Sequence, residues 1–307
     1  MAVNVKEWFR PASSGWGMVF SRSWTGEEPR AVLVIAHGMS EHSGRYDHFA
    51  RFLAENGYAV YMNDHPGHGR SAQVKGHFAD KDGWEHTVSD LKALAGQAAE
   101  ERPGLPLFLM GHSMGSFLAR SYIVRYGDEL AGCVLCGTMG KNPAVPAGLA
   151  LAAAQCRLLG PRSRGSTLDK LASTGYNKRI ERPVNGSAWL SRDDEVCRRF
   201  QADPLCCFPF TAGGYRDLFT GLREISAPQW AGRVPKELPV LLIAGEEDPV
   251  GNYGQGPQQV VDALRVAGVR RVELKLYPGM RHEVLNELGK EEAYEDVLRW
   301  LNGRLPA

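Results

Sequence analysis

The chain has 307 residues, of which 43% are hydrophobic, 36 are basic and 35 are acidic. This balance is ordinary for a globular protein, and a net charge of +1 argues against long-range attraction to nucleic acid or to an anionic membrane. The N-terminal residues lack the apolar stretch of a secretory signal, and the longest apolar run, 144–156, is too short to span a bilayer. We therefore expect a cytoplasmic protein without a nucleic-acid partner, and we leave peripheral membrane contact and oligomeric state open.

Six cysteines are present, and Cys133 and Cys136 form a CxxC pattern within an apolar run. If this run is a strand, residues three apart point to opposite faces, which suits neither a metal clamp nor a redox pair. No second CxxC or Cys/His pair completes a zinc site. The cysteines are therefore expected to be buried small side chains, and no metal is predicted.

The first half of the chain alternates between two kinds of pattern. Residues 4–10 and 17–24, separated by the turn-rich 11–15, predict a β-hairpin. Short apolar runs typical of buried strands then alternate with helical patterns, which predicts a mostly parallel sheet with helices on both faces, an α/β fold. The predicted strands are 31–38, 58–64, 105–111 and 130–138, and the predicted helices are 45–57, 84–101 and 116–127.

The alternation stops near residue 140 and returns near residue 226. Residues 141–225 contain helical patterns but no convincing buried strand, and Ser191 and Asp194 fit a capping box that predicts a helix start. Strands are again predicted in 238–250 and 271–279, and helices at 256–268 and 291–304. We therefore expect one α/β core, formed by 1–140 and 226–307, that is interrupted by a mainly helical cap at 141–225.

The motif GHSMG, residues 111–115, stands where a predicted strand changes into a predicted helix. This is the pattern of a nucleophile elbow, in which a serine on a tight turn needs small neighbours two positions away. Gly111 and Gly115 meet that requirement, and the helix N-terminus behind Ser113 offers N–H groups to an anion. Ser113 is the predicted nucleophile.

A serine needs a base and a carboxylate that orients the base, and in this fold they follow the serine in the order acid, histidine. Eight of the nine histidines precede Ser113, and only His282 follows it, just after the last predicted strand. Of the acids after the preceding strand, Asp248 is favoured because Asp-Pro fixes a turn that can aim the carboxylate at the histidine, whereas Glu246 and Glu247 are expected to face solvent.

Two backbone N–H groups should receive the oxyanion. One is that of Met114, the residue after the nucleophile, and the other is expected from the loop after strand 31–38, where Met39 is the predicted donor. Asp64, His65 and His68 lie in the loop 63–71, which admits a metal or general-base interpretation. Its glycines and its proline favour a structural loop that borders the pocket.

With these motifs the chain resembles α/β-hydrolases of the monoacylglycerol lipase and lysophospholipase group, whose hydrolase domain is of the serine aminopeptidase type. The resemblance covers nearly the whole chain and rests on the segments 37–71, 111–120, 244–251 and 277–287. It implies a triad of Ser113, Asp248 and His282 with oxyanion donors Met39 and Met114.

The resemblance also carries implications about the substrate. It places Glu41 and Arg45 near the glycerol end of the substrate, but two residues four apart can equally form an ion pair at a helix start. It makes the insertion a lid over an acyl pocket. The apolar stretch 144–156 is then either the lipid-facing part of the lid or an amphipathic helix packed on the core.

The predicted activity is hydrolysis of a carboxylic ester through an acyl-enzyme, with a monoacylglycerol or lysophospholipid-like substrate and without a cofactor. An aminopeptidase-type peptidase and an acyltransferase would use the same triad. The peptidase would need an acid for the substrate's amine, for which Asp193, Asp194 or Glu195 is a candidate. A non-catalytic ligand-binding protein on the same fold would lack a triad residue, and no residue of the triad is missing.

Overall fold

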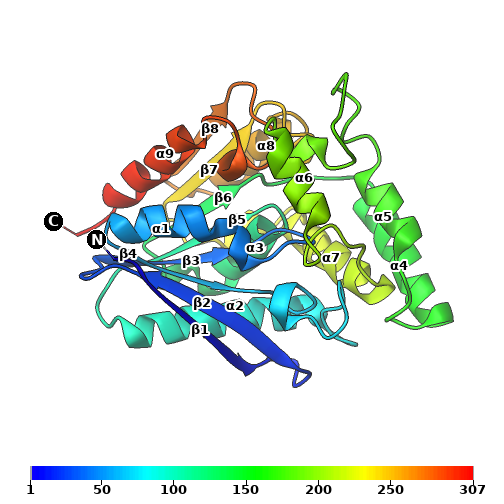
Figure 1. Ribbon diagram of the computed structural model, residues 1–307, viewed down its shortest axis with the longest axis horizontal. Coiled ribbons are helices and arrows are strands. Elements are labelled where there is room, and N and C mark those ends of the chain that lie inside the picture. The colour runs from blue at the N-terminus through cyan, green and yellow to red at the C-terminus, as the bar shows by residue number, and fades with distance from the viewer. Residues whose placement is uncertain (1, 307) are drawn as a thin grey trace.

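The computed structural model describes residues 2–306, with the backbone alone at 172 and 173. Within them eight strands form one sheet in the order β1-β2-β4-β3-β5-β6-β7-β8 (Figure 1). The strands are β1 (Asn4–Pro11), β2 (Met18–Thr25), β3 (Ala31–Ala36), β4 (Tyr58–Asn63), β5 (Leu107–His112), β6 (Gly132–Cys136), β7 (Val240–Gly245) and β8 (Val272–Tyr277).

The sheet is antiparallel at one edge and parallel elsewhere. β1 and β2 form the predicted hairpin, β2 pairs antiparallel with β4, and all pairs from β4 to β8 are parallel. Because β3 pairs with β4 on one side and with β5 on the other, the chain order reverses at β3. Loops that leave the carboxyl ends of the strands at such a point frame a crevice, which is where ligands bind in open α/β sheets.

Helices cover both faces of the sheet, as the buried strands require. In β3, Val32 and Val34 face one hydrophobic core, whereas Leu33 and Ile35 face the other. The first core is closed by α2 (Gly83–Glu101), α3 (Met114–Tyr126) and α8 (Gln255–Val266), and the second by α1 (Asp47–Glu55) and α9 (Lys290–Asn302). The predicted α/β fold is confirmed.

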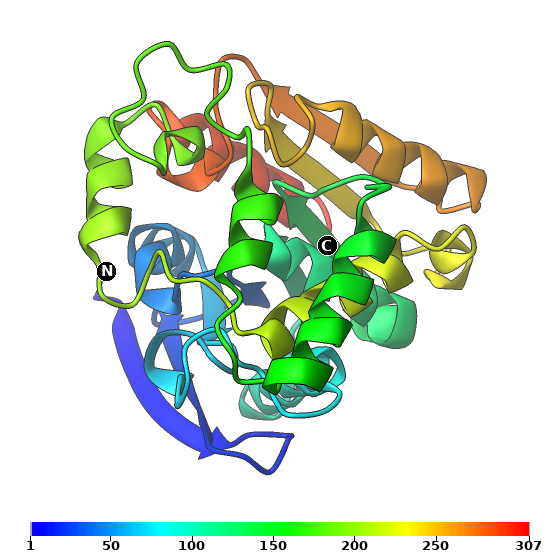
Figure 2. The ribbon, with the colours of Figure 1, turned by 90° about the vertical axis from the view of Figure 1, so that its right-hand side faces the viewer.

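The segment between β6 and β7 is helical. It contains α4 (Val145–Leu159), α5 (Ser166–Ser173), α6 (Asp194–Ala202), α7 (Ala212–Ile225) and the 3₁₀ turn η4 (Ala188–Leu190), and its described residues add no strand to the sheet. α7 packs against α2, α3 and α4, whereas α4 and α5 project to one side (Figures 1 and 2). None of the helices within 2–306 has the length and apolar character needed to cross a bilayer. The division into core and cap stays a prediction.

The predicted capping box is wrong in its cap residue. α6 begins at Asp194, and its N-cap is Asp193, whose carboxylate accepts the N–H of Glu195. Ser191 is extended, and its hydroxyl accepts the N–H of Asp193 instead. Two local hydrogen-bonded turns follow one another here, so the helix starts where expected but is capped by the aspartate.

Arg120 joins the two ends of the helical insertion to α3. Its side chain is 2% exposed, and its guanidinium donates to the carbonyl of Met139 at 2.9 Å and to that of Ile225 at 2.5 Å. Ile225 is the last residue of α7, where the helix dipole favours a positive charge. The guanidinium also stacks on the ring of Trp230, 4.3 Å from its centre. One side chain therefore fixes the entry and the exit of the insertion to the helix that starts at Ser113.

We expect Arg120→Met to lower the free energy of unfolding by about 2–4 kcal/mol, because two buried carbonyls lose their donors while the desolvation cost of the guanidinium is relieved. Urea unfolding followed by circular dichroism measures this. The matched control is Arg233→Met, which changes an exposed arginine and should shift stability by no more than about 0.5 kcal/mol. Equal midpoints for the two variants would contradict this role of Arg120.

Candidate active site

Ser113 occupies the tight turn between β5 and α3. Its φ of 53° and ψ of −121° are unusual for a residue with a side chain, which marks a strained backbone. A Cβ atom at Gly111 would lie 2.1 Å from the carbonyl oxygen of Gly115, and one at Gly115 would lie 2.0 Å from that of Ala36. Both glycines are therefore required by close backbone contacts, as the motif predicts.

Asp248 and His282 form a buried pair in the loops that follow β7 and β8. Their exposed fractions are 0% and 1%, and His282 Nδ1 lies 2.9 Å from Asp248 Oδ1. The same carboxylate oxygen accepts the N–H of Val250. Because a carboxylate can only accept, Nδ1 carries the proton and Nε2 carries the lone pair of the neutral ring. Nε2 has no hydrogen-bond partner within the described residues. Glu246 and Glu247 are exposed, as expected.

Ser113 and His282 line the same cavity, which has a volume of about 650 Å³. Within residues 2–306 no hydrogen bond joins Ser113 Oγ to the His282 ring, so the structure brings together two of the three predicted catalytic residues by direct contact and the third by a shared cavity. Catalytic hydrogen bonds of this kind often tighten only when substrate is bound.

The predicted oxyanion donors lie on either side of Ser113. A Cβ atom at Gly38 would approach Ser113 Cβ to 3.2 Å, so the loop after β3 packs directly against the nucleophile. Met39 and Met114 both line the cavity. Their backbone N–H groups donate to no protein acceptor in the part of the chain that the structure describes, which leaves both available to a ligand.

Two buried glutamates and a partly buried arginine lie beside His282. Arg45 Nη1 is 2.6 Å from Glu41 Oε2, and both terminal nitrogens of Arg45 are 2.7 Å from the oxygens of Glu283. The expected ion pair at the helix start therefore exists, and Glu283 extends it. Glu41 and Glu283 also line the cavity, whereas Arg45 is not among its lining residues. The only local signal for Glu283 in the sequence is its position next to His282. Its ion pair with Arg45 could not be predicted, because the two residues are 238 positions apart in the chain.

Burial acts on the pKa of both histidines that line the cavity, His112 and His282, but the neighbouring carboxylates make His282 different. Burial alone would lower the pKa of His282, but Asp248, Glu283 and Glu41 outweigh it and raise the pKa above its ordinary value of 6.5. Burial lowers the pKa of His112 to about 4, and the ring of His112 lies only 4.8 Å from that of His282. His282 is thus the more basic of these two adjacent imidazoles.

The loop 63–71 is structural, as the sequence favoured, but none of its residues lines the cavity that it was expected to border. The carboxylate of Asp64 accepts the N–H and the hydroxyl of Ser43 and the N–H of Arg70. His65 and His68 are fully buried and do not line the cavity. Cys133 and Cys136 are likewise buried free thiols in β6, and burial raises the pKa of both.

One group of side chains consists of residue types that bind metal ions, but the proton of its histidine ring is on the nitrogen that would have to bind the metal. Ligand atoms of His42, Asp203 and Cys206 lie within 4.8 Å of one another. His42 Nδ1 accepts the N–H of Gly44, so the proton of the neutral ring is on Nε2, which contacts Asp203 Oδ2 at 3.0 Å. The ring therefore has no free lone pair to offer a metal ion.

The inserted segment covers the histidine. The ring centre of Trp189, in η4, lies 5.0 Å from that of His282, and the ring centre of Tyr176 lies 4.8 Å from that of Trp189. The backbone N–H of Glu283 donates to the carbonyl of Leu190 at 2.8 Å. Sequence analysis did not identify Trp189, because nothing local marks a tryptophan that packs on a residue 93 positions further along the chain.

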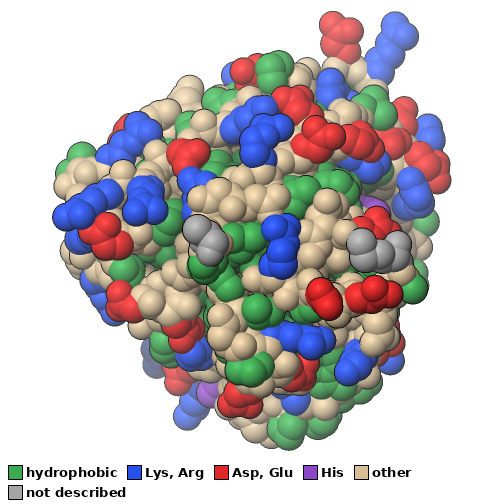
Figure 3. All heavy atoms as spheres, turned by 90° about the vertical axis from the view of Figure 1, so that its left-hand side faces the viewer, with side chains coloured by type: hydrophobic (Ala, Val, Ile, Leu, Met, Phe, Trp, Pro, Cys, Tyr) green, Lys and Arg blue, Asp and Glu red, His purple; other side chains and the backbone are tan. Residues whose placement is uncertain are grey.

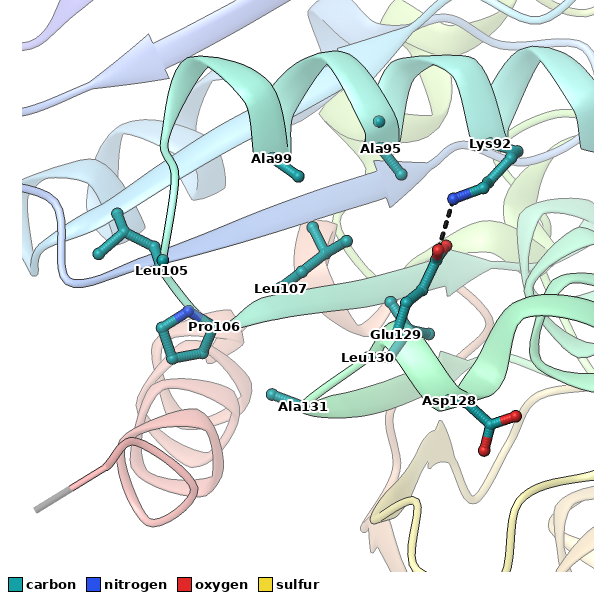
Figure 4. Close-up of a pocket in the computed structure, with 12 residues that line it drawn as sticks. Lys92, Ala95, Ala99, Leu105, Pro106, Leu107, Asp128, Glu129, Leu130 and Ala131 are labelled. Atoms are coloured by element: carbon teal, nitrogen blue, oxygen red, sulfur yellow. Dashed lines mark hydrogen bonds and ion pairs between the residues drawn. The ribbon is translucent and has the colours of Figure 1, made fainter.

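A second hollow lies at the amino ends of β5 and β6, beside α2 (Figure 4). Its volume is about 460 Å³. The residues that line it are small or apolar apart from Asp128 and an ion pair between Lys92 and Glu129. No histidine, cysteine or serine is among the residues that line it, so it offers none of the residue types predicted for the catalytic site.

A mostly parallel sheet that carries a nucleophile elbow, followed along the chain by a buried acid and then a histidine, defines a serine hydrolase of the α/β-hydrolase fold. The chain belongs to the serine aminopeptidase, S33, family, whose profile matches residues 27–289. Both the predicted fold and the predicted family are thereby confirmed.

Individual relatives agree with this assignment. The chain is 35% identical over 289 residues to the monoacylglycerol lipase of Mycolicibacterium smegmatis, with 92% of each chain covered. It is 29% identical to human monoglyceride lipase, with 93% of this chain and 87% of the human chain covered. The crystal structure of a thermostable carboxyl esterase from Bacillus coagulans in complex with glycerol is similar at a TM-score of 0.92 and 32% identity, covering 99% of this chain and all of that chain.

We expect the His282 ring to titrate above pH 6.5 and Glu283→Gln to lower its pKa, because loss of a buried negative charge destabilises the imidazolium. NMR titration of histidine-labelled protein measures this, with His282→Gln to assign the resonance. Glu246→Gln, which changes an exposed acid in the Asp248 loop, serves as the control and should leave the titration unchanged. A pKa below 6.5 for His282 in the wild type would contradict this electrostatic analysis.

Proposed function

We propose that this protein hydrolyses carboxylic esters of monoacylglycerols and lysophospholipid-like lipids through an acyl-enzyme on Ser113. The observation that carries the proposal is the buried Asp248–His282 pair, whose histidine lines a largely apolar cavity together with Ser113. The ester specificity is supported by the relatives, which include monoacylglycerol lipases and a carboxyl esterase.

In the proposed mechanism, His282 Nε2 takes the proton of Ser113 Oγ while the oxygen attacks the ester carbonyl. Asp248 holds the ring with its proton on Nδ1 and stabilises the imidazolium that forms. The N–H groups of Met39 and Met114 hold the oxyanion, and each such donor typically contributes about 3 kcal/mol. His282 then protonates the departing alcohol, and water releases the fatty acid by the same steps. A raised pKa of His282 means that activity declines as the pH falls towards 6.5 and the base becomes protonated.

The cavity walls suggest how the substrate lies. Phe117 of α3, Gly148 of α4, and Leu218 and Leu222 of α7 form an apolar part suited to an acyl chain. Glu41 and Glu283 form the polar part, which suits the hydroxyl groups of glycerol. In this arrangement Arg45 holds the two glutamates in place through its hydrogen bonds to them.

We also propose that residues 141–225 serve as the cap over this cavity. Residues from α4 and η4 line it, as do Tyr176 and Phe208 of the connecting segments. The aminopeptidase alternative receives no support from its candidate acids, because Asp193, Asp194 and Glu195 do not line the cavity. Asp193 instead caps α6.

The cap has a surface suited to lipid. Leu158 and Leu159 at the end of α4 are 79% and 70% exposed, and Leu151 and Leu171, which line the cavity, are also exposed. The stretch 157–182 contains seven basic and two acidic residues. The face with the two termini, on the other side of the molecule, instead shows Lys and Arg interspersed with Asp and Glu (Figure 3). We propose that α4 and α5 contact anionic membranes transiently, so that substrate enters from the bilayer.

The triad is tested with monoacylglycerols of graded acyl length. We expect Ser113→Ala to reduce kcat by about 10⁴-fold or more and to abolish labelling by a fluorophosphonate. Ser166→Ala changes an exposed serine of α5 and should retain wild-type turnover. Unchanged turnover in a correctly folded Ser113→Ala variant would overturn the proposed function, and faster cleavage of N-terminal amides than of esters would favour the peptidase.

Membrane contact is tested by sedimentation with vesicles of phosphatidylcholine and phosphatidylglycerol. We expect Leu158→Asp combined with Leu159→Asp to weaken binding by on the order of tenfold, because two exposed apolar anchors become charged. Turnover of a short soluble ester should be retained. Val266→Asp on α8, where the valine is 90% exposed, is the control for adding charge elsewhere. Equal binding of both variants would contradict contact through α4.

A further inference from the structure

Three histidines are buried behind the loop that carries Met39. His37, His65 and His68 are 0% exposed, and the centre of the His37 ring lies 4.1 Å from that of His65 and 5.2 Å from that of His68. None of them lines the catalytic cavity, and the mechanism above uses none of them. His37 nevertheless directly precedes the two residues, Gly38 and Met39, that form one side of the proposed oxyanion site.

Hydrogen bonds fix the protonation of His37. Its Nε2 accepts the backbone N–H of His65 at 3.0 Å, so in the neutral ring the proton is on Nδ1. Nδ1 therefore donates to the carbonyl of Gly38, 2.8 Å away. Burial together with the neighbouring His68 lowers the pKa of His37, which keeps the ring neutral and preserves this pattern.

The bond to the Gly38 carbonyl sets the direction of the next N–H group. This carbonyl and the N–H of Met39 belong to the same peptide unit, and in a trans peptide they point in opposite directions. A carbonyl held against the His37 ring therefore turns the N–H of Met39 away from the histidines. Gly38 lies against Ser113, so this N–H is directed to the side of the loop where the nucleophile lies.

The preceding peptide unit is held at both ends. The carbonyl of His37 lies 3.2 Å from Nε2 of His65, which is the donor, and the N–H of Gly38 donates to the carboxylate of Glu41 at 2.5 Å. Two successive peptide units thus present four polar groups, and three of them have protein partners. The fourth is the N–H of Met39, which donates to no acceptor within the described residues.

We propose that His37, oriented by His65, is a positioning residue that fixes the Gly38–Met39 peptide unit with its N–H available to the oxyanion. The inference rests on the proposed function and adds a role for two residues outside the cavity. Without the His37 donor, the Gly38 carbonyl loses its partner and the peptide unit is free to rotate. Rotation would exchange an N–H for a carbonyl oxygen beside the developing negative charge, which opposes catalysis.

Isosteric amides separate this role from simple packing. The side-chain nitrogen of asparagine takes the place of histidine Nδ1, and the amide of glutamine takes the place of Nε2. His37→Asn therefore keeps the donor to Gly38 and loses the acceptor for His65, whereas His37→Gln does the opposite. We expect kcat for a monoacylglycerol to fall by about 10²-fold or more in His37→Gln and by less than about tenfold in His37→Asn, with KM changed little in both.

At His65 the preference should be reversed, because its Nε2 donates to the His37 carbonyl. His65→Gln keeps that donor and should retain most of kcat, whereas His65→Asn should lose it. An alkyl trifluoromethyl ketone gives a second measurement, because its adduct with Ser113 carries the oxyanion. Its inhibition constant should rise in the low-kcat variants by the same factor as kcat falls, while inhibition by the free fatty acid stays unchanged.

Thermal unfolding measures the folding of all four variants independently of activity, and the His65 pair replaces the His37 pair should the latter fail to fold. Equal loss of kcat in Asn and Gln variants at either position would overturn the positioning role, as would losses that appear in KM alone. An inactive wild type, or a Ser113 that no fluorophosphonate labels, would instead overturn the proposed function, so the two failures are distinguishable.

Discussion

The site depends on one steric constraint, the approach of three backbone segments around Ser113. The turn that exposes the serine is closed so tightly that residues 111 and 115 touch each other, and the start of α3 lies against the end of β3. No side chain larger than a hydrogen atom fits at either glycine. Because α3 begins at Met114, directly after the serine, this contact also brings the loop that follows β3 beside it, so that the proposed nucleophile and the proposed oxyanion donors are positioned by one arrangement of the backbone.

In the same region, the pKa values of three histidines are shifted downwards and the pKa of a fourth, His282, is shifted upwards. His37, His65 and His112 are buried beside other imidazoles, and burial lowers the pKa of each. His282 is equally buried, but Asp248 and Glu283 lie next to it and raise its pKa. The protein thus keeps neutral imidazoles where fixed hydrogen-bond donors and acceptors are needed, and a basic one where a proton must be accepted. Carboxylate placement, rather than depth of burial, separates the two groups.

The sequence predicts those features that local pattern determines. The order of strands and helices and the elbow glycines follow from neighbours in the chain, and the choice of His282 follows from its position after Ser113 and the last predicted strand. The sequence does not predict contacts between distant segments: Arg120 with both ends of the insertion, Glu283 with Arg45, or Trp189 on the His282 ring. The N-cap residue of α6 is Asp193 and not the predicted Ser191 for a related reason. Serine and aspartate are equally good N-cap residues, and the surrounding structure decides between them.

These contacts divide the site between two parts of the chain: the loops after the parallel strands hold the proposed catalytic residues, and the insertion shapes the cavity for the substrate. The loops that carry Ser113, Met39, Asp248 and His282 all leave the parallel strands and are held by hydrogen bonds within the core. The insertion supplies most of the apolar walls of the cavity but touches the proposed catalytic residues mainly through η4. Substitutions in α4 or α7 can therefore change the shape of the cavity without disturbing the relay. With the proposed site and cap, such a division would allow one set of loops to act on different esters according to the segment inserted above them.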